Sequence, residues 1–550
     1  MNDQGVKSTV FDINGNMIRS GRWARGRKGM VSTGKEEVSK IGIEIMKKGG
    51  SAIDAAVAVG FAIGVCEPNA SGLGGGGFIL IRDGLSKENV FVDFREVAPQ
   101  KISSSLFTVG SDGKVLNQEN AIGGKSVCTP GEVAGLIYAL EKYGTMTLAD
   151  VLEPSIKLAE EGFYVSPLLA GDMKKYVEYL KRYEMSRKTF LKDGKPYKVG
   201  ERFTNPNLAK SLRHIAQGGR DAFYKGHIAN EIVETVKLYG GVLDKEDLEN
   251  YRVEVRSPVI GNYRGYTIIS SPPPSSGGTH IIQILNMLEH YDIKSMEVNS
   301  AKYLHMFSEV FKIAYTDRAK HMGDTKYVNV PVKGLSSKEY SKELTKIIDE
   351  FHSKEYECKD PWLYEHEDTT HYSIGDEKGN LVSVTKTINH FFGSCVVAGD
   401  TGILLNDQVA DFSTEDDNPN SIESGKKPLS SMSPTIILKD NRPFAILGTP
   451  GGSRIISTLV QVISKLIDHE MDIQDAIDSP RIIDDTRNEI SYEGRISTRV
   501  AMKLRLMGHK VKKIGDWDRR LGAVQGIKYE MNGELTGAAD PRRDGKAYGY

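Results

Sequence analysis

The chain has 550 residues, of which 39% are hydrophobic and 26% charged, with 72 Lys and Arg against 73 Asp and Glu. A domain usually holds roughly 100–200 residues, so this length allows about three or four domains or one large α/β body, whose core needs neither disulfide nor metal. A net charge of −1 gives no reason to expect nucleic acid as a partner.

The cysteines and the N-terminal segment indicate the cellular compartment. No two cysteines have CxxC spacing, so we expect unpaired structural thiols at Cys66, Cys128, Cys358 and Cys395. Residues 1–23 lack the apolar run of a secretory signal. The chain as written is therefore expected to be cytoplasmic, or periplasmic or secreted if a presequence was removed. The longest apolar stretch, residues 52–66, is too short to span a bilayer.

The first part of the chain predicts helices followed by a glycine-rich strand entrance. Residues 32–48 have helical spacing with Ser32 or Thr33 as the cap, and residues 53–66 predict a buried helix. The glycine run in residues 71–78 lacks the Lys of a phosphate loop and leads into a strand at residues 78–82. We interpret it as a close backbone crossing under a catalytic centre or core.

Residues 91–94 predict a second strand, which ends at Arg95. Arg95 is either a functional arginine or one half of a surface ion pair.

The middle of the chain predicts an accessory helical region and then a charged connection. Helical spacing occurs within residues 130–260, at 151–161, 207–217 and 228–239. A strand at 263–270 leads through three prolines into a helix at 279–290, and an amphipathic helix follows at 301–318. Residues 333–368 are dominated by Lys, Glu, Ser and Asp and predict a solvated, mobile connection, which suits a region that is cut.

The pattern becomes β-rich after Thr369. We expect one hairpin from residues 371–374 and 381–387, a further apolar segment at 396–405, and a second hairpin from 434–438 and 443–447. Glycines 451 and 452 then open a helix that runs to about residue 467.

The sequence offers residues for three kinds of catalytic site: a zinc site, a serine nucleophile and an N-terminal threonine nucleophile. His366 and His371 are five residues apart beside β-branched residues, whereas a zinc helix needs two His four apart, so no metal is expected. Ser453 lacks the closing glycine of a nucleophile elbow. A third possibility is that Thr369 becomes a free N-terminus: its α-amine, with a pKa near 8, would then serve as the base for its own hydroxyl.

Several motifs that follow one another along the chain support Thr369 as an N-terminal nucleophile. TTHYS from Thr369, PLSSMSP from Pro428 and GTPGGSR from Gly448 resemble the signatures of the γ-glutamyltranspeptidase family. LGGGGF from Leu73, DFRE from Asp93, the segment 272–278 and the closing Asp540-Pro541-Arg542 also match. The resemblance runs from about Gly29 to the C-terminus.

The resemblance implies an α+β fold of the N-terminal-nucleophile hydrolase type, a four-layer αββα sandwich with a helical accessory region. It implies self-cleavage between Asp368 and Thr369 into a large subunit, residues 1–368, and a small catalytic subunit, residues 369–550, which stay together as a heterodimer. It implies no cofactor and no metal.

The resemblance also implies roles for individual residues. Arg95, with Ser430 and Ser431, would bind the α-carboxylate of a γ-glutamyl group, and Asn389, Gln408 and Asp411 would hold its α-ammonium. The N–H groups of Gly451 and Gly452 would bind the oxyanion, and Thr387 would support the nucleophile. A donor such as glutathione would acylate Thr369, and water or an amino-acid amine would take the group.

The short segment before Ser430 leaves the choice of substrate open. The segment between Asp411 and Ser430 is short where many members carry a lid, so the resemblance implies an open site, which could also admit poly-γ-glutamate. The alternatives are an acylase of the same fold, for example for glutaryl-cephalosporin, and an inactive relative that only binds glutamyl peptides. Glutaryl has no ammonium, so Asn389, Gln408 and Asp411 favour an amino-acid acyl group.

Overall fold

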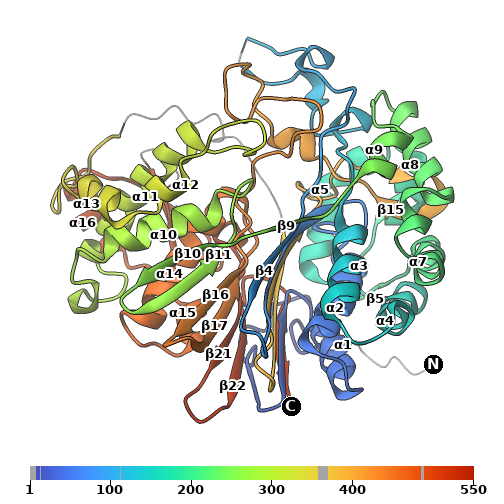
Figure 1. Ribbon diagram of the computed structural model, residues 1–550. Coiled ribbons are helices and arrows are strands. Elements are labelled where there is room, and N and C mark those ends of the chain that lie inside the picture. The colour runs from blue at the N-terminus through green and yellow to red at the C-terminus, as the bar shows by residue number, and fades with distance from the viewer. Residues whose placement is uncertain (1–7, 13, 112, 357–368, 485–488) are drawn as a thin grey trace.

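The computed structural model describes residues 8–12, 14–111, 113–356, 369–484 and 489–550. Two seven-stranded antiparallel sheets lie face to face between two layers of helices (Figure 1). The expected αββα sandwich is therefore confirmed.

The first sheet, called here the β12 sheet, has the strand order β23-β2-β12-β13-β3-β4-β9. These strands are Lys546–Gly549, Gly29–Thr33, Thr370–Asp376, Leu381–Thr387, Gly76–Arg82, Asn89–Phe94 and Glu254–Arg256. Side chains alternate across β12 and β13 because successive residues of a strand point to opposite faces. Tyr372, Ile374, Val382 and Val384 join the core under the outer helices, whereas the polar residues between them face the other sheet.

The second sheet, called here the β17 sheet, has the order β1-β22-β21-β17-β16-β11-β10. Its strands are Ala24–Gly26, Leu535–Ala539, Gln525–Tyr529, Arg442–Gly448, Thr435–Lys439, Tyr266–Ser270 and Val259–Tyr263. β16 and β17 form the expected second hairpin, as β12 and β13 form the first.

Serine side chains connect the two sheets. Ser373 Oγ in β12 donates to Gln525 O (3.0 Å), Ser383 Oγ in β13 donates to Leu447 O (3.2 Å), and Ser32 Oγ in β2 donates to Ala538 O (2.7 Å). A buried hydroxyl is stable only when it is hydrogen-bonded. These bonds therefore favour one position of the β12 sheet relative to the β17 sheet.

The helices form two outer layers and an accessory group. Against the β12 sheet lie α1, α2 and α3, with α4 packed on α2; these are Glu36–Lys47, Ala52–Cys66, Glu132–Tyr143 and Leu148–Glu161. Every residue of α2 is buried, as its Ala- and Gly-rich sequence predicts. Beyond them the accessory helices α5 to α9 are Pro167–Leu180, Glu184–Phe190, Pro206–Tyr224, His227–Leu238 and Lys245–Asn250.

The layer on the β17 sheet contains α10, α14 and α15, with α11 packed against α10 (Figure 1, left). The helices of this half of the molecule are α10 to α16: Gly277–Leu288, Ala301–His321, Val332–Leu335, Lys338–Thr345, Ile455–Ile467, Ile473–Asp478 and Thr498–Leu506. The smaller strands are β5 and β8 (Phe163–Tyr164, Arg202–Phe203), β6 and β7 (Leu191–Lys192, Lys195–Pro196), β14 and β15 (Val397–Ala398, Ile403–Leu404), and β18 to β20 (Ile482–Ile483, Glu489–Glu493, Lys510–Ile514).

Two local predictions were wrong in where an element begins. Ser32 and Thr33 end strand β2 instead of capping a helix, because they pair with Ser373 and Tyr372 of β12, and α1 starts only at Glu36. The strand predicted at 263–270 is β11, which begins only at Tyr266, because Arg264 and Gly265, with φ of +50° and +82°, form the turn that joins it to β10.

Part of the charged connection is helical: α13 lies within residues 333–356 and packs on α10, and Leu335 is buried. Residues 349–356 form hydrogen bonds with His305, Glu309 and Lys312 of α11. The mobility of this connection stays a prediction. Residues 357–368, the rest of that prediction, lie outside the described residues.

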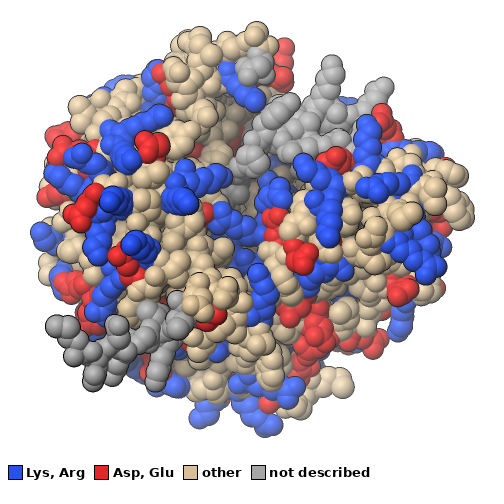
Figure 2. Space-filling model, turned by 180° about the vertical axis from the view of Figure 1, so that it is seen from behind, with Lys and Arg blue, Asp and Glu red and all other residues tan. Residues whose placement is uncertain are grey.

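Within the described ranges, no helix has both the length and the apolar character needed to cross a membrane. Basic and acidic side chains are interspersed over the face shown in Figure 2, as the balanced composition predicts. Cys66, Cys128 and Cys395 are free and buried, as expected, and Cys358 lies outside the described residues.

Candidate active site

Thr369 lies directly before the first residue of β12 and is 2% exposed. Thr370 is opposite Lys386 of β13, so the same register places Thr369 beside Thr387, the last residue of β13. Arg543 Nη1 donates to Thr369 O (2.9 Å). The threonine singled out by the sequence is therefore held at the start of a central strand. Asp368 lies outside the described residues.

The backbone after β13 turns back towards Thr387. Thr387 Oγ1 accepts the N–H of Asn389 (2.8 Å), and Asn389 has a φ of +76°, a conformation that Asn tolerates better than most residues. Asn389 Nδ2 donates to Asp407 O (3.1 Å). Its other amide atom, Oδ1, is buried and has no hydrogen-bond partner among the described residues.

Arg95 and Asp411 come together in the interior. Arg95 follows β4, and its Nη2 lies 2.5 Å from Asp411 Oδ2 and also donates to Leu429 O (3.1 Å). Both side chains are at most 2% exposed, so the alternative of a surface ion pair is wrong. Beside them, burial raises the pKa of Glu96 to about 7.

Gln408 joins this pair, because its Nε2 donates to Asp411 Oδ2. The Gln408 Oε1 atom is buried without a hydrogen-bond partner among the described residues, as is Asn389 Oδ1. A buried polar atom without a partner costs roughly 1–3 kcal/mol, so such atoms often mark the place of a ligand. These two oxygens are acceptors that suit an ammonium group.

Ser430 and Ser431 follow Leu429 and are held by two residues that precede Thr369, Ser276 and Arg318. Ser430 O accepts the N–H of Ser276 (2.7 Å). Ser431 Oγ accepts a hydrogen bond from Arg318 Nη2 (2.9 Å), whose Nε donates to Ser276 Oγ (2.9 Å). Arg318 was not expected from the sequence. It lies on α11 and is only 1% exposed, which only the structure shows.

The short segment between Asp411 and Ser430 folds back on its own ends. Asn420 Nδ2 donates to Asp411 O (2.5 Å), and Asn420 Oδ1 accepts the N–H of Leu429 (2.8 Å). Asn420 therefore ties Asp411, which precedes the segment, to Leu429, its last residue.

Gly451 and Gly452 form a turn between β17 and α14. Their φ angles of +137° and +59° are accessible to glycine but strained for other residues, which explains why glycines occur here. The backbone N–H groups at such a helix entrance can bind an anion.

His371 is not placed for proton transfer. Its two ring nitrogens bond to Thr385 Oγ1 (2.8 Å) and Ser373 Oγ (3.1 Å) between the sheets. Burial lowers its pKa to about 3, so the ring is neutral in ordinary conditions.

A small cavity with charged walls lies at the start of β12. Its lining includes three cations and three carboxylates: Lys35, Arg519, Arg543, Glu67, Asp172 and Asp544. Lys35 Nζ lies 2.6 Å from Asp544 Oδ2, and Arg519 Nη2 lies 2.5 Å from Asp172 Oδ1. Burial raises the pKa of Glu67, whose side chain bonds to Thr370. These residues are far apart in the sequence and only folding brings them together, so no local pattern predicted the cavity.

An αββα sandwich in which a central strand begins at a buried threonine defines the class of N-terminal-nucleophile hydrolases. The sequence signature described as gamma-glutamyltranspeptidase matches residues 38–550. The glutathione hydrolase proenzyme of Escherichia coli (strain K12) is 42% identical over 94% of this chain and 91% of its own length. The acylase ACY 1 proenzyme of Pseudomonas sp. (strain SE83) is 39% identical over 95% and 93%.

Among solved structures, that of cephalosporin acylase from Bacillus halodurans superposes with a TM-score of 0.87 at 28% identity, covering 96% of this chain and 97% of that one. The chain belongs to the gamma-glutamyltranspeptidase family.

Proposed function

We propose that this protein is a self-cleaving γ-glutamyltransferase and glutathione hydrolase with Thr369 as its nucleophile. The observation that carries the proposal is a series of contacts that starts at Thr387, which the strand register puts beside Thr369, and leads through Asn389 and the adjoining residues Asp407 and Gln408 to Asp411 and Arg95. It combines a guanidinium with a carboxylate and two buried amide oxygens that lack partners among the described residues. An amino-acid end group needs this combination, because it carries both a carboxylate and an ammonium.

Maturation would begin with attack of Thr369 Oγ on the carbonyl carbon of Asp368. The C–N bond to Thr369 breaks, its nitrogen takes a proton, and the acyl group becomes an ester on Oγ. Water then cleaves the ester, leaving the Asp368 carboxyl and a free Thr369 amine. The products would have 368 residues and 182 residues (550 − 368).

The fragments would remain together, since each sheet contains strands from both. β12 pairs with β2, β13 pairs with β3, and β16 pairs with β11. Residues 1–368 and 369–550 are thus two chains of one folded body in this proposal.

In turnover, the Thr369 amine would take the hydroxyl proton while Oγ attacks the γ-carbonyl of the donor. Its pKa near 8 allows it to be neutral and basic at working pH. Backbone N–H groups at Gly451 and Gly452 would stabilise the oxyanion, a contribution of roughly 3–4 kcal/mol per donor in comparable sites. The protonated amine then gives its proton to the leaving amide nitrogen as the C–N bond breaks, and water or an amine removes the γ-glutamyl group from Oγ.

The donor's amino-acid end would lie against Arg95 and Asp411. Its α-carboxylate would bind the Arg95 guanidinium with Ser430 and Ser431. Its α-ammonium would bind Asp411 and the free oxygens of Asn389 and Gln408. Glutathione, which ends in such a group, is the substrate class that this arrangement and the similar proenzyme of Escherichia coli support.

The experiment compares release of the anilide amine from a γ-glutamyl anilide, with and without glycylglycine, in wild type and Thr369→Ala. We expect two bands on a denaturing gel and amine release for wild type, and one uncleaved, inactive chain of 60.7 kDa for the variant. A variant that matures normally would overturn the assignment of Thr369.

The second candidate is an acylase, favoured by the 39% identity to acylase ACY 1 and by the superposition on cephalosporin acylase. A cleaved protein that releases amine from a glutaryl anilide but not from a γ-glutamyl anilide would establish this candidate instead. A protein that is never cleaved would be a glutamyl-peptide-binding relative.

A further inference from the structure

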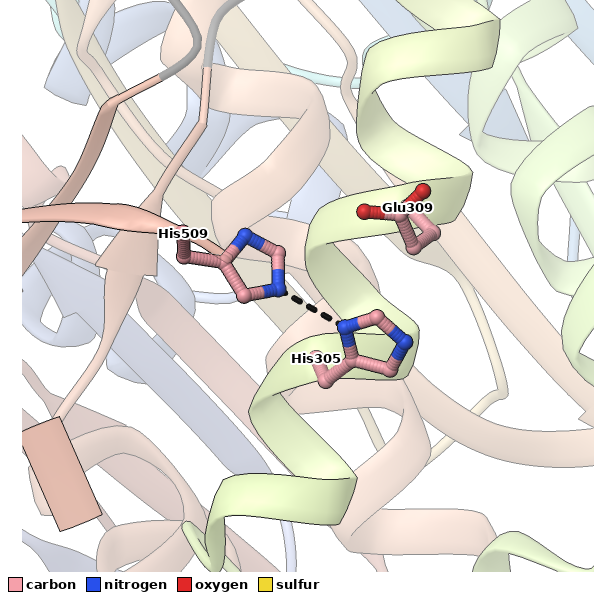
Figure 3. A group of neighbouring side chains, drawn as sticks. All are labelled: His305, Glu309 and His509. Atoms are coloured by element: carbon pink, nitrogen blue, oxygen red, sulfur yellow. Dashed lines mark hydrogen bonds between the residues drawn. The ribbon is translucent and has the colours of Figure 1, made fainter. Parts of the chain in front are cut away.

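A buried group of two histidines and one glutamate lies on the far side of the β17 sheet, away from Thr369. His305 and Glu309 are one turn apart on α11, and His509 lies between α16 and β20 (Figure 3). One ligand atom from each side chain lies within 4.8 Å of the other two, and all three residues are buried. His305 Nδ1 and His509 Nε2 are 2.7 Å apart.

The outer atoms of the two α11 side chains are held by the segment that follows α13. His305 Nε2 bonds to Asp349 O (2.8 Å). Glu309 Oε2 accepts hydrogen bonds from Tyr356 OH (2.9 Å) and from the backbone N–H of Lys354 (3.3 Å). Metal-bound histidines and carboxylates are usually held by such outer bonds, which leave the inner atoms for the ion.

Lys312 is the cation that now balances the glutamate. Its Nζ lies 2.5 Å from Glu309 Oε1 and also donates to Ser353 Oγ (3.0 Å) and Lys354 O (2.6 Å). These two oxygens would still hold the ammonium if a divalent ion took over Glu309 Oε1. The His305–His509 hydrogen bond would be replaced as well, after a shift of one ring proton between the nitrogens of His509.

We propose that His305 Nδ1, His509 Nε2 and Glu309 Oε1 bind a divalent late transition-metal ion, with water as a further ligand. Two imidazoles and one carboxylate are a donor set typical of Zn²⁺. The expectation of no metal rested on the spacing of His366 and His371 alone. His305 and His509 are 204 residues apart in the sequence, so their spacing gave no sign of a shared site.

The position of the ion gives it a structural role. α11 and the segment 349–356 precede Thr369, whereas His509 follows it. If the chain is cut as proposed, the ion joins the two fragments at a point remote from the reaction. Ion binding itself does not depend on the cut, so the uncleaved Thr369→Ala protein is expected to bind it too.

The test uses the full-length protein, stripped of metal by a chelator and dialysed, with Zn²⁺ as the probe. We expect titration calorimetry and elemental analysis to give one Zn²⁺ per chain in wild type and in Thr369→Ala. Glu309→Gln and His509→Gln should weaken binding at least tenfold. The matched control is His227→Gln, which alters the exposed group His227, Glu231 and Asp400 and should leave the affinity unchanged.

Lys312→Met separates a metal site from a purely hydrogen-bonded cluster. Removing the competing ammonium should raise the Zn²⁺ affinity while lowering the melting temperature of the metal-free protein. Circular dichroism at low temperature would verify that every variant is folded.

The proposal is overturned if folded wild type binds no Zn²⁺, or if Glu309→Gln and His509→Gln bind it as wild type does. These outcomes leave the assignment of Thr369 intact, because γ-glutamyl anilide cleavage tests that separately.

Discussion

Arg95 and Asp411 form a buried ion pair in which Nη2 lies 2.5 Å from Oδ2, and each was expected from the sequence to bind an opposite end of the same substrate group. Isolated buried charges are costly, so each residue compensates the other before substrate arrives. The pair would thus bind the amino-acid end of a substrate in one orientation, with the Arg95 guanidinium facing its carboxylate and the Asp411 carboxylate facing its ammonium.

Asp411→Asn should therefore change substrate preference as well as activity. Loss of one partner of a buried, hydrogen-bonded charge pair costs roughly 3–5 kcal/mol of binding, so kcat/KM for a γ-glutamyl anilide is expected to fall about 150- to 5,000-fold. A glutaryl anilide lacks the ammonium and serves as the internal control, for which the loss should be at least tenfold smaller. Equal losses for the two anilides would show that Asp411 acts only through folding.

Arg543→Gln should slow maturation. The guanidinium holds Thr369 O at 2.9 Å, and misplacing a reacting group by about 1 Å can cost 100-fold in rate. We expect the precursor band to persist at least tenfold longer on a gel time course. Arg520→Gln is the control, because Arg520 pairs with Asp518 and its side chain is 52% exposed. Unchanged maturation of Arg543→Gln would contradict a positioning role.

Gly448→Ala should prevent normal folding. A Cβ at Gly448 would lie 2.1 Å from the His371 ring, between the two sheets. Overpacking of a core usually costs roughly 1–3 kcal/mol, and this contact is more severe than most.

Gly171→Ala on α5 is the matched control. No atom lies within 4 Å of its added methyl group, so it should stabilise the protein by about 0.5–1 kcal/mol. Urea unfolding would measure both variants, and a Gly448→Ala protein as stable as wild type would disprove the described sheet contact.

His371 should make stability depend on pH. Its pKa is about 3 in the folded protein and about 6.5 when unfolded, so between these values only the unfolded chain takes up the proton. Stability should then fall with decreasing pH below about 6.5, by about 1.4 kcal/mol per pH unit for this group.

Urea unfolding at pH 7 and pH 5, in the Thr369→Ala background so that a single chain unfolds, would test this. The background is expected to lose about 2 kcal/mol more between the two pH values than the same protein with His371→Asn. Parallel losses would exclude His371 as the source.

Local patterns predicted the parts of the fold that depend on neighbours in sequence. The alternation in β12 and β13 and the small residues of α2 were sufficient, since each reports directly on a face that must be buried. Strand β2 was missed because Ser32 and Thr33 are good helix caps when read alone. Their pairing with residues 373 and 372 is a long-range contact that overrides this local preference.

The residues of the candidate site likewise fall into a group that the sequence predicted and a group set by long-range contacts. Arg95, Ser430 and Ser431 lie in motifs that carry the family resemblance, and the role of Asp411 was implied by the same resemblance. Arg318 and Arg543 are fixed by contacts with residues more than 100 positions away, so neither spacing nor composition pointed to them. The contacts of residues 333–356 with α11 were missed for a related reason: Tyr356 bonds to Glu309 and Ser353 accepts from Lys312, and these pairs are far apart in the sequence.

The central position of β12 has an entropic consequence. Chain ends are ordinarily mobile, and an enzyme that used a mobile end would have to immobilise it in every catalytic cycle. Here hydrogen bonds to β13 begin at the residue after Thr369, and β2 pairs on the other side from Tyr372. The freedom of a new N-terminus would thus be lost once, during folding, so that each acylation starts from a nucleophile that is already ordered.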